Sequence, residues 1–348
     1  MCWVTVCVTR WIRSCGSNGG VTMNTFLEIK DLSVEYRSGK RRVHAVNHLN
    51  LKLGEQEALG FVGETGAGKT TTALSILRIL PDPPAIVTGG EIIYKDRNLF
   101  QISEKEMRMI RGSEIAMIFQ DPMTSLDPVK TVGAQIAEMI LLHEHCNKKE
   151  AAEKAKDMLE IVGIDRNRSN EYPHQFSGGM KQRVVIAIAL SCNPALLIAD
   201  EPTTALDVTI QAQILELMKD LKKKYSSSLI MITHDLGIVA ELCDNVAIMY
   251  AGSVIEYGNV YDIYKDYRHP YTQALFDSIP DIHKEQEHLK VISGLAPDPS
   301  NIPAGCPFHP RCPYCTDRCK TEEPETVMIN ETHWAKCHRA LEGVTENE

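Results

Sequence analysis

Residues 63 to 70, with the sequence GETGAGKT, match the phosphate-binding pattern G-x-x-x-x-G-K-[ST]. Its glycines allow the backbone to curl, so that N–H groups surround the β- and γ-phosphates at the positive N-terminus of a helix. Lys69 is expected to reach the β- and γ-phosphate oxygens, and the Thr70 hydroxyl to coordinate Mg²⁺. Such a loop must follow a strand and open a helix. A short apolar run before Gly63 and helical spacing up to Pro81 meet both requirements.

Two carboxylates follow a second apolar run, residues 196 to 200 (LLIAD). Near-continuous apolar character is typical of a parallel strand that is covered on both faces. Asp200, at the end of this strand, is expected to hold Mg²⁺ directly or through water. Glu201 is expected to face the γ-phosphate and polarise the attacking water, with a surface salt bridge as the alternative. Together the two motifs predict a nucleoside triphosphatase.

Five of the eleven cysteines lie between Cys306 and Cys337, in a Pro-rich stretch. Because no export signal is expected, a disulfide framework is not favoured, and clustered thiols suggest a metal. Four thiolates are enough for a zinc site or a [4Fe–4S] cluster, and the spacing favours neither, although the C-x2-C pair Cys312 and Cys315 suits zinc. The alternative is reduced cysteines packed as small apolar side chains. A metal here is expected to be structural, because the motifs above are remote in sequence.

Alternating strands and helices are expected to position these groups, which predicts an α/β fold around a sheet. The expected strands are residues 26–36, 43–53, 57–63, 114–120, 195–200 and 228–234, of which the first two alternate apolar and polar residues as antiparallel strands do. The expected helices are residues 131–143, 148–162 and 179–192, in addition to the one that follows the phosphate loop. After about residue 257 no further strands are expected, and a Pro-, His- and Cys-rich tail indicates a separate small module.

The composition narrows the class of protein. Of 348 residues, 43% are hydrophobic and 24% are charged, and the formal net charge is −9. This acidic balance argues against a general nucleic-acid-binding protein, and no run approaches the about 18 uninterrupted apolar residues of a membrane helix. Residues 1 to 9 are apolar, but no positive segment precedes them and Arg10 and Arg13 end the run early, so no signal peptide is expected. We interpret residues 1 to 22 as an upstream extension before Met23.

A third motif decides between classes of nucleoside triphosphatase. Residues 176 to 183 (FSGGMKQR), just before the strand with Asp200, resemble the signature loop of the ABC ATPase family, which is LSGGQ-like. Gln120 in MIFQDP, residues 203–207 (TTALD) and His234 in MITHD follow the order of that family's other motifs. The resemblance implies the P-loop type of ABC ATPase fold: a mixed sheet core, an antiparallel β subdomain and an α-helical subdomain with the signature.

The signature loop carries the phosphate contact between subunits in this family. Ser177, Gly178 and Gly179 begin a helix, where a hydroxyl and backbone amides make an anion site. The resemblance implies that this site touches the γ-phosphate held by the phosphate loop of the other subunit, so that ATP joins two ATPase domains. Phe176 and Met180 replace the leucine and glutamine of the common signature. Since the serine and the glycines are kept, activity is expected.

The family assigns further roles by resemblance. Gln120 matches the residue that contacts Mg²⁺ and the attacking water. His234 matches the histidine that grips the γ-phosphate and orients Glu201; a core histidine is its alternative. Asp207 matches the acid that communicates between the two sites of the dimer. Tyr36 fits the aromatic residue that stacks on adenine, with a plain core tyrosine as a serious competitor.

The expected site therefore extends over much of the chain. The expected ATP-binding residues are Tyr36, Gly63, Glu64, Thr65, Gly66, Ala67, Gly68, Lys69, Thr70, Thr71, Gln120, Ser177, Gly178, Gly179, Asp200 and Asp207. The expected catalytic residues are Glu201, His234 and Gln120, and the expected Mg²⁺ ligands are Thr70, Gln120 and Asp200.

Two segments, residues 119–136 and 269–280 (HPYTQALFDSIP), resemble the ATP-binding subunits of oligopeptide and dipeptide permeases, whose relatives import nickel and other small solutes. This resemblance covers about residues 24 to 340. It implies an ATPase coupled to import, bound to two transmembrane permease subunits at the cytoplasmic face of the membrane. A second ATPase subunit, a copy or a paralogue, and indirectly an extracytoplasmic solute-binding protein are the other expected partners, with no nucleic acid. The transported solute cannot be read from this chain.

A non-transport ABC ATPase of DNA repair or translation is the alternative. Such proteins carry long coiled-coil insertions, tandem ATPase domains or basic segments, which this acidic sequence with one phosphate loop and one signature lacks.

The resemblance also implies a domain organisation. Residues 1–23 are expected to be a disordered extension, residues 24–258 the ABC ATPase domain with its helical subdomain at about 121–190, and residues 259–348 a C-terminal module of the oligopeptide-permease type. Some ATP-binding subunits of oligopeptide and dipeptide permeases hold a [4Fe–4S] cluster at the positions that match Cys306, Cys312, Cys319 and Cys337. Zinc remains the alternative. Cys315 falls outside the pattern.

Overall fold

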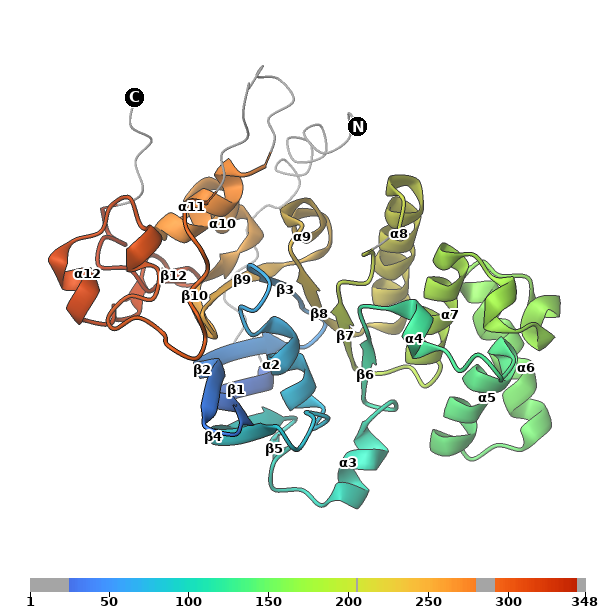
Figure 1. Ribbon diagram of the computed structural model, residues 1–348. Coiled ribbons are helices and arrows are strands. Elements are labelled where there is room, and N and C mark those ends of the chain that lie inside the picture. Colours follow the sequence, from blue (N-terminus) through green and yellow to red (C-terminus); the bar gives the residue numbers. More distant parts are fainter. Residues whose placement is uncertain (1–24, 205, 280–291, 343–348) are drawn as a thin grey trace. The chain divides into compact units, whose positions relative to one another are not determined.

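The computed structural model describes residues 25–204, 206–279 and 292–342, and the expected extension at residues 1–23 lies outside them (Figure 1). The chain forms two compact units that interleave along the sequence. The first unit comprises Met1–Lys52, Leu59–Phe100 and Thr233–Glu348, and the second comprises Leu53–Ala58 and Gln101–Ile232. The fold is α/β, with one antiparallel sheet and one sheet of mixed strand direction. None of the described helices is long and apolar enough to cross a membrane.

An antiparallel sheet forms one part of the first unit, and it confirms the two alternating strands expected from the sequence. Its strand order is β2 (Arg41–Gly54), β1 (Thr25–Ser38), β4 (Ala85–Tyr94) and β5 (Arg97–Asn98). Strands β1 and β4 pair from Leu27 opposite Tyr94 to Tyr36 opposite Ala85. Most apolar residues of β1 are buried, and its charged residues Lys30, Asp31 and Arg37 are exposed, as expected of a half-buried strand.

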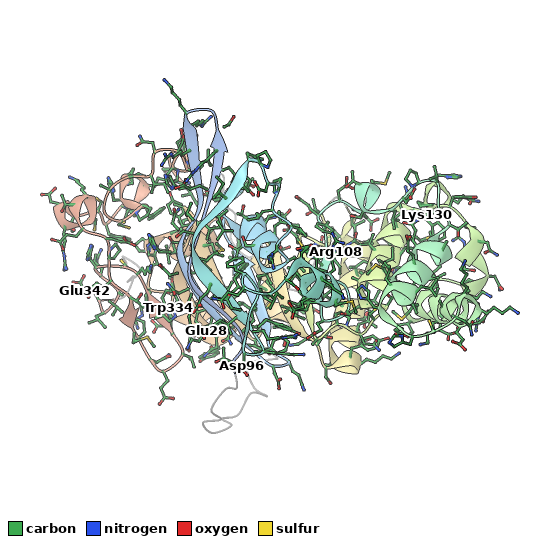
Figure 2. All side chains as sticks on the ribbon, turned by 90° about the horizontal axis from the view of Figure 1, so that it is seen from below. Glu28, Asp96, Arg108, Lys130, Trp334 and Glu342 are labelled. Carbon is green, nitrogen blue, oxygen red and sulfur yellow. The ribbon has the colours of Figure 1, made fainter. Side chains whose placement is uncertain are left out.

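The second sheet of this unit carries the phosphate loop. Strand β3 (Ala58–Val62) is buried throughout and pairs in parallel with β9 (Asn245–Tyr250). Strand β10 (Ser253–Asn259) pairs antiparallel with β9 and with β12 (Trp334–Ala335), which pairs with β11 (Val327–Met328). Figure 2 labels Trp334. Its side chain stacks on that of Tyr257, with ring centroids 6.0 Å apart. The prediction that strands end near residue 257 is therefore wrong, because two short strands of the tail extend this sheet.

Short helices accompany these strands in the first unit. They are α2 (Lys69–Ile76), α9 (Leu236–Leu242), α10 (Val260–Lys265), α11 (Pro270–Asp277), the 3₁₀ turn η3 (His309–Arg311) and α12 (Asp317–Thr321). Helix α2 ends well before Pro81, where helical spacing had predicted its end. Arg78 has a φ of 51°, in the left-handed region that an α-helix excludes.

The second unit has three parallel strands and a group of helices. Strand β7 (Leu196–Asp200) pairs with both β6 (Ile115–Ile118) and β8 (Ser228–Thr233). Strands β7 and β8 are buried at every position, which confirms the reading of their apolar runs. The helices are α3 (Glu104–Ile110), α4 (Pro122–Ser125), α5 (Val132–His143), α6 (Lys148–Ile161), α7 (Gly178–Leu190) and α8 (Val208–Tyr225), with the 3₁₀ turns η1 (Arg166–Asn170) and η2 (Pro173–Gln175).

Helix α8 was not among the expected helices, although its sequence carries the signals of one. Its buried residues Ile214, Leu215, Met218 and Leu221 recur at helical spacing. Asp207 caps its N-terminus, and three lysines in the last turn face the negative end of the helix dipole.

Candidate nucleotide-binding site

The phosphate loop in the first unit is shaped by two glycines that no other residue could replace without strain. Gly68 precedes α2 with a φ of +100°, and a Cβ there would lie 2.4 Å from the carbonyl oxygen of Ala45. A Cβ at Gly63 would lie 2.3 Å from the carbonyl oxygen of Met249. Only glycine permits such a close approach. The strand, loop and helix expected from the motif are therefore present, and the loop packs tightly on backbone.

Lys69 and Tyr36, both expected to contact ATP, each contact another residue of the phosphate-loop segment. The Lys69 side chain is largely buried, and its ammonium donates to the carbonyl oxygens of Gly63 (2.6 Å) and Glu64 (3.0 Å). The Tyr36 hydroxyl lies 3.4 Å from the Thr71 hydroxyl, which brings two of the expected residues together. Because Tyr36 is only half-buried, it does not sit as a core tyrosine does.

Glu64, the second residue of the loop, contacts the C-terminal part of the chain. Its carboxylate accepts two hydrogen bonds from the guanidinium of Arg311, at 2.7 and 3.0 Å. Its backbone N–H donates to the hydroxyl of Tyr271 at 2.9 Å. Sequence reasoning missed both partners, and the only available signals were an arginine inside the cysteine-rich segment and the tyrosine of the HPY motif.

The two expected carboxylates lie at the C-terminal end of strand β7 in the second unit. Asp200 is buried at its end, and Glu201 follows with a φ of 46°, a left-handed conformation that costs a residue with a side chain about 1 kcal/mol or more. The Glu201 carboxylate accepts hydrogen bonds from the Gln120 amide (3.0 Å) and the Thr204 hydroxyl (2.9 Å). Two expected catalytic residues, Gln120 and Glu201, are thus in direct contact. Thr204 was not predicted to contact the site.

The signature loop begins helix α7 with an exposed Ser177, whose hydroxyl accepts a hydrogen bond from the N–H of Met180 at 3.4 Å. The two departures from the common signature share a contact. The guanidinium of Arg168 lies 4.4 Å from the ring centroid of the buried Phe176 and donates to the sulfur of Met180 at 3.5 Å. Arg168 therefore supports this variant of the loop from one side.

Two further expected residues lie at the ends of secondary-structure elements. Asp207 caps helix α8 by accepting from the N–H of Ile210 at 2.9 Å, which gives it a local structural role. His234 directly follows β8, in the first unit, and its side chain is exposed. Exposure contradicts the alternative of a core histidine at this position.

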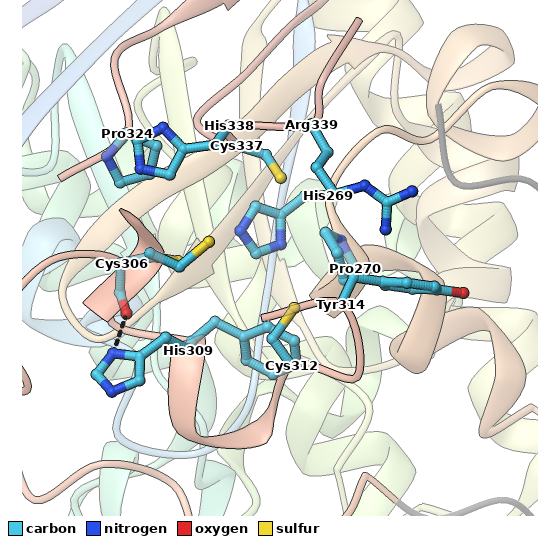
Figure 3. A pocket seen from close by; sticks show the side chains of 12 residues that line it. His269, Pro270, Cys306, His309, Cys312, Tyr314, Pro324, Cys337, His338 and Arg339 are labelled. Atoms are coloured by element: carbon cyan, nitrogen blue, oxygen red, sulfur yellow. Dashed lines mark hydrogen bonds between the residues drawn. The ribbon is translucent and has the colours of Figure 1, made fainter. Parts of the chain in front are cut away.

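Four cysteines of the tail line one cavity: Cys306, Cys312, Cys319 and Cys337. Figure 3 shows the sulfurs of Cys306, Cys312 and Cys337 directed toward it, around the side chain of His269. Burial, reinforced by the neighbouring cysteines, raises the pKa of the Cys306 thiol to about 12 and that of Cys312 to about 11. Across residues 25–204, 206–279 and 292–342, no three His, Cys, Asp or Glu side chains are arranged to hold one metal ion.

Buried His269 supports the same region. Its Nδ1 accepts a hydrogen bond from the N–H of Tyr271 at 3.0 Å, as the N-cap of α11. Burial lowers the pKa of His269 to about 3, which keeps the ring neutral and Nδ1 available as an acceptor. Cys315 is not among the residues that line the cavity, and its thiol donates to the carbonyl oxygen of Thr316 at 3.5 Å.

Comparisons with known proteins agree with these motifs. Residues 46–204 match the family model "ABC transporter", and residues 255–319 match "Oligopeptide/dipeptide transporter, C-terminal region". The chain is 49% identical to the oligopeptide transport ATP-binding protein OppD of Bacillus subtilis, over 91% of this chain and 89% of that protein. The chain belongs to the ABC transporter ATP-binding proteins. A second relative of this ABC protein is the dipeptide transport ATP-binding protein DppD of Escherichia coli, 46% identical over 91% of this chain and 97% of that protein.

Solved structures of ABC proteins share the fold. A dimeric post-hydrolysis state of the ATP-binding cassette MJ0796, bound to ADP and Pi, has a TM-score of 0.61 and 25% sequence identity, over 67% of this chain and 98% of that one. The ABC protein CbiO1 of Clostridium perfringens, part of a transporter complex, has a TM-score of 0.59 and 28% identity, over 69% and 90%.

Proposed function

We propose that this protein is the ATP-hydrolysing subunit of an ABC importer that takes up oligopeptides, dipeptides or related small solutes across the cytoplasmic membrane. The observation that carries the proposal is the match to both family models, one for the ATPase and one for the C-terminal region of oligopeptide and dipeptide transporters. Two relatives named for peptide transport, OppD and DppD, each align with 91% of this chain. The alternative, a DNA-repair or translation ATPase, is not favoured by any of these matches.

In the proposed mechanism, Lys69 and backbone N–H groups of the phosphate loop bind the β- and γ-phosphates, and Tyr36 stacks on the adenine. The N–H groups of Glu64 and Ala67 are not among them, because they donate to Tyr271 and to the Glu64 carbonyl oxygen. Thr70, Gln120 and Asp200 would hold Mg²⁺, which would supply positive charge to neutralise the phosphate oxygens.

The Glu201 carboxylate then accepts a proton from water as the water oxygen forms a bond to the γ-phosphorus. The bond from this phosphorus to the β–γ bridging oxygen breaks, which leaves ADP and phosphate. Gln120 orients Glu201 through the hydrogen bond described above, and His234 orients Glu201 and the γ-phosphate. The support for this assignment is the paired geometry of Gln120 and Glu201 beside the buried Asp200.

The second half of each composite site comes from another ATPase subunit, a copy or a paralogue. Residues 177–179 of one subunit contact the γ-phosphate at the other, and Asp207 communicates between the two sites. The exposed start of helix α7 supports this role, because Ser177 and Gly178 are exposed at the positive end of the helix. The dimeric MJ0796 cassette is a precedent in a related fold. Two transmembrane permease subunits hold this pair at the cytoplasmic face of the membrane, and an extracytoplasmic solute-binding protein delivers the solute.

A deletion strain tests the transport function. Uptake of a radiolabelled dipeptide or tripeptide should fall when the chain is deleted and return with the wild-type chain, but not with Glu201→Gln. Membrane permeases should co-purify with the tagged chain. Unchanged uptake of every peptide tested, with co-purifying ribosomes or DNA, would favour the non-transport alternative.

We further propose that Cys306, Cys312, Cys319 and Cys337 hold a [4Fe–4S] cluster. Zn²⁺ is the alternative that the geometry supports less, because no three ligating side chains of the described residues are arranged around one ion. The residue types fit, because four thiols line one cavity. The role is structural: ligation cross-links a loop with few apolar residues. Protein purified without oxygen should contain about four irons per chain. Cys312→Ser should lose them, whereas the control Cys315→Ser should not. One zinc per chain would favour the alternative, and a metal-free chain would contradict both.

A further inference from the structure

Glu64 of the phosphate loop is held at its backbone and at its side chain by the C-terminal part of the first unit. Arg311 binds its carboxylate with two hydrogen bonds, of 2.7 and 3.0 Å, across 247 residues of sequence. Tyr271 accepts from its N–H across 207 residues. The Arg311 side chain is only 4% exposed, so this bidentate ion pair is shielded from solvent on the arginine side. Such pairs define one geometry much more strongly than surface ion pairs do.

Both partners of Glu64 are themselves fixed in an aromatic cluster. Arg311 also donates to the hydroxyl of Tyr250 at 3.3 Å, and its guanidinium lies 5.9 Å from the ring centroids of Tyr250 and Phe308. The ring of Tyr271 packs 4.6 Å from that of Tyr250 and 5.4 Å from that of Phe308. Because Arg311 directly precedes Cys312, the loop with the cysteines determines where the guanidinium lies.

The segment that presents Tyr271 is anchored to strand β10. The buried carboxylate of Glu256 accepts hydrogen bonds from the backbone N–H groups of Arg268 (2.5 Å) and His269 (3.0 Å). It also lies 2.9 Å from Nε2 of the buried His333. This network holds the start of helix α11, from which Tyr271 reaches the phosphate loop.

Glu64 poses an electrostatic problem for a loop that binds phosphates. An uncompensated carboxylate would repel the nucleotide, whereas its pairing with Arg311 neutralises the charge at that position. Its N–H is directed to Tyr271 and not toward the ligand. We propose that Arg311 and Tyr271 are positioning residues for ATP: they neutralise and orient Glu64, and so make nucleotide affinity depend on the C-terminal part of the first unit. This inference rests on the proposed assignment of residues 63–70 as the phosphate site.

Binding of a fluorescent ADP analogue to the purified full-length chain tests this inference. Arg311→Met should raise the dissociation constant about 5-fold or more, in the range typical of coupling between sites. Adding Glu64→Gln should return it to within about 3-fold of wild type, since no unpaired charge then remains. Tyr271→Phe should give a smaller rise, because it removes one neutral hydrogen bond.

Two reference variants make the result interpretable. Arg318→Met removes an exposed ion pair with Glu322, also in the C-terminal part of the first unit, and should leave the dissociation constant unchanged. Lys69→Ala should abolish binding if the proposed phosphate site is correct. Unchanged affinity in Arg311→Met, together with lost binding in Lys69→Ala, would overturn the inference and leave the site assignment intact. Normal binding in Lys69→Ala would overturn the assignment itself. Failure of Glu64→Gln to restore affinity in Arg311→Met, or an equal loss in Arg318→Met, would contradict charge neutralisation by Arg311.

Discussion

Replacement of Glu256 by Gln should loosen the HPY segment by a calculable amount. In the structure, both carboxylate oxygens are used: one accepts from the N–H of Arg268 and lies beside His333, and the other accepts from the N–H of His269. A Gln side chain keeps one oxygen and presents an NH₂ group where the other was, so at least one buried N–H loses its acceptor. A lost hydrogen bond to a charged acceptor costs about 1.5–3 kcal/mol. We take about 2 kcal/mol as the expected loss of local stability.

Hydrogen exchange is the appropriate assay, because a chain with two units need not unfold in one step. A loss of about 2 kcal/mol should lower the protection of amides in helix α11 by about 30-fold. Strands β7 and β8, in the other unit, should keep their protection. Glu241→Gln on the exposed part of α9 is the matched control and should change neither. Unchanged protection of α11 in Glu256→Gln would refute the role of this carboxylate as an anchor.

Two other predictions concern the proposed composite site. Ser177→Ala should reduce ATP hydrolysis, because the hydroxyl acts on the ATP bound by the partner subunit. The isolated monomer should keep its nucleotide affinity, measured by titration. A fall in monomer affinity as large as the fall in hydrolysis would contradict this prediction. Gly68→Ala should weaken nucleotide binding strongly, because its φ of +100° and the 2.4 Å approach to Ala45 force the loop to move. Binding as tight as in wild type, measured by titration with the fluorescent analogue, would contradict the tight packing of the loop.

The sequence predicted best those features whose signal is local. Residues 58–76 carry the strand, loop and helix of a phosphate site within one short segment, and the structure has all three. Strands β7 and β8 were equally clear, because continuous apolar runs match full burial on both faces. The contact between Gln120 and Glu201, 81 residues apart, joins two residues to which the family resemblance gave separate roles, and the resemblance did not predict this contact.

Features that depend on distant contacts were not predictable in this way. No local pattern assigns Arg311 to Glu64 or Tyr271 to the N–H of Glu64, since their separation exceeds 200 residues. Strands β11 and β12 have two residues each and form only because β10 offers a free edge, so no periodicity could predict them. The premature end of α2 depends on the left-handed conformation of Arg78, a residue without a strong preference for it.

In the proposed function, Glu201 activates water for ATP hydrolysis in an importer ATPase. Single-turnover hydrolysis by Glu201→Gln, measured beside its nucleotide affinity, tests it most directly. We predict a fall in the rate of about 10²–10⁴-fold with nearly unchanged ATP affinity, because the general base is lost while residues 63–70 stay intact. The variant should also accumulate an ATP-bound dimer. Hydrolysis within a few-fold of wild type would show that Glu201 is not the general base.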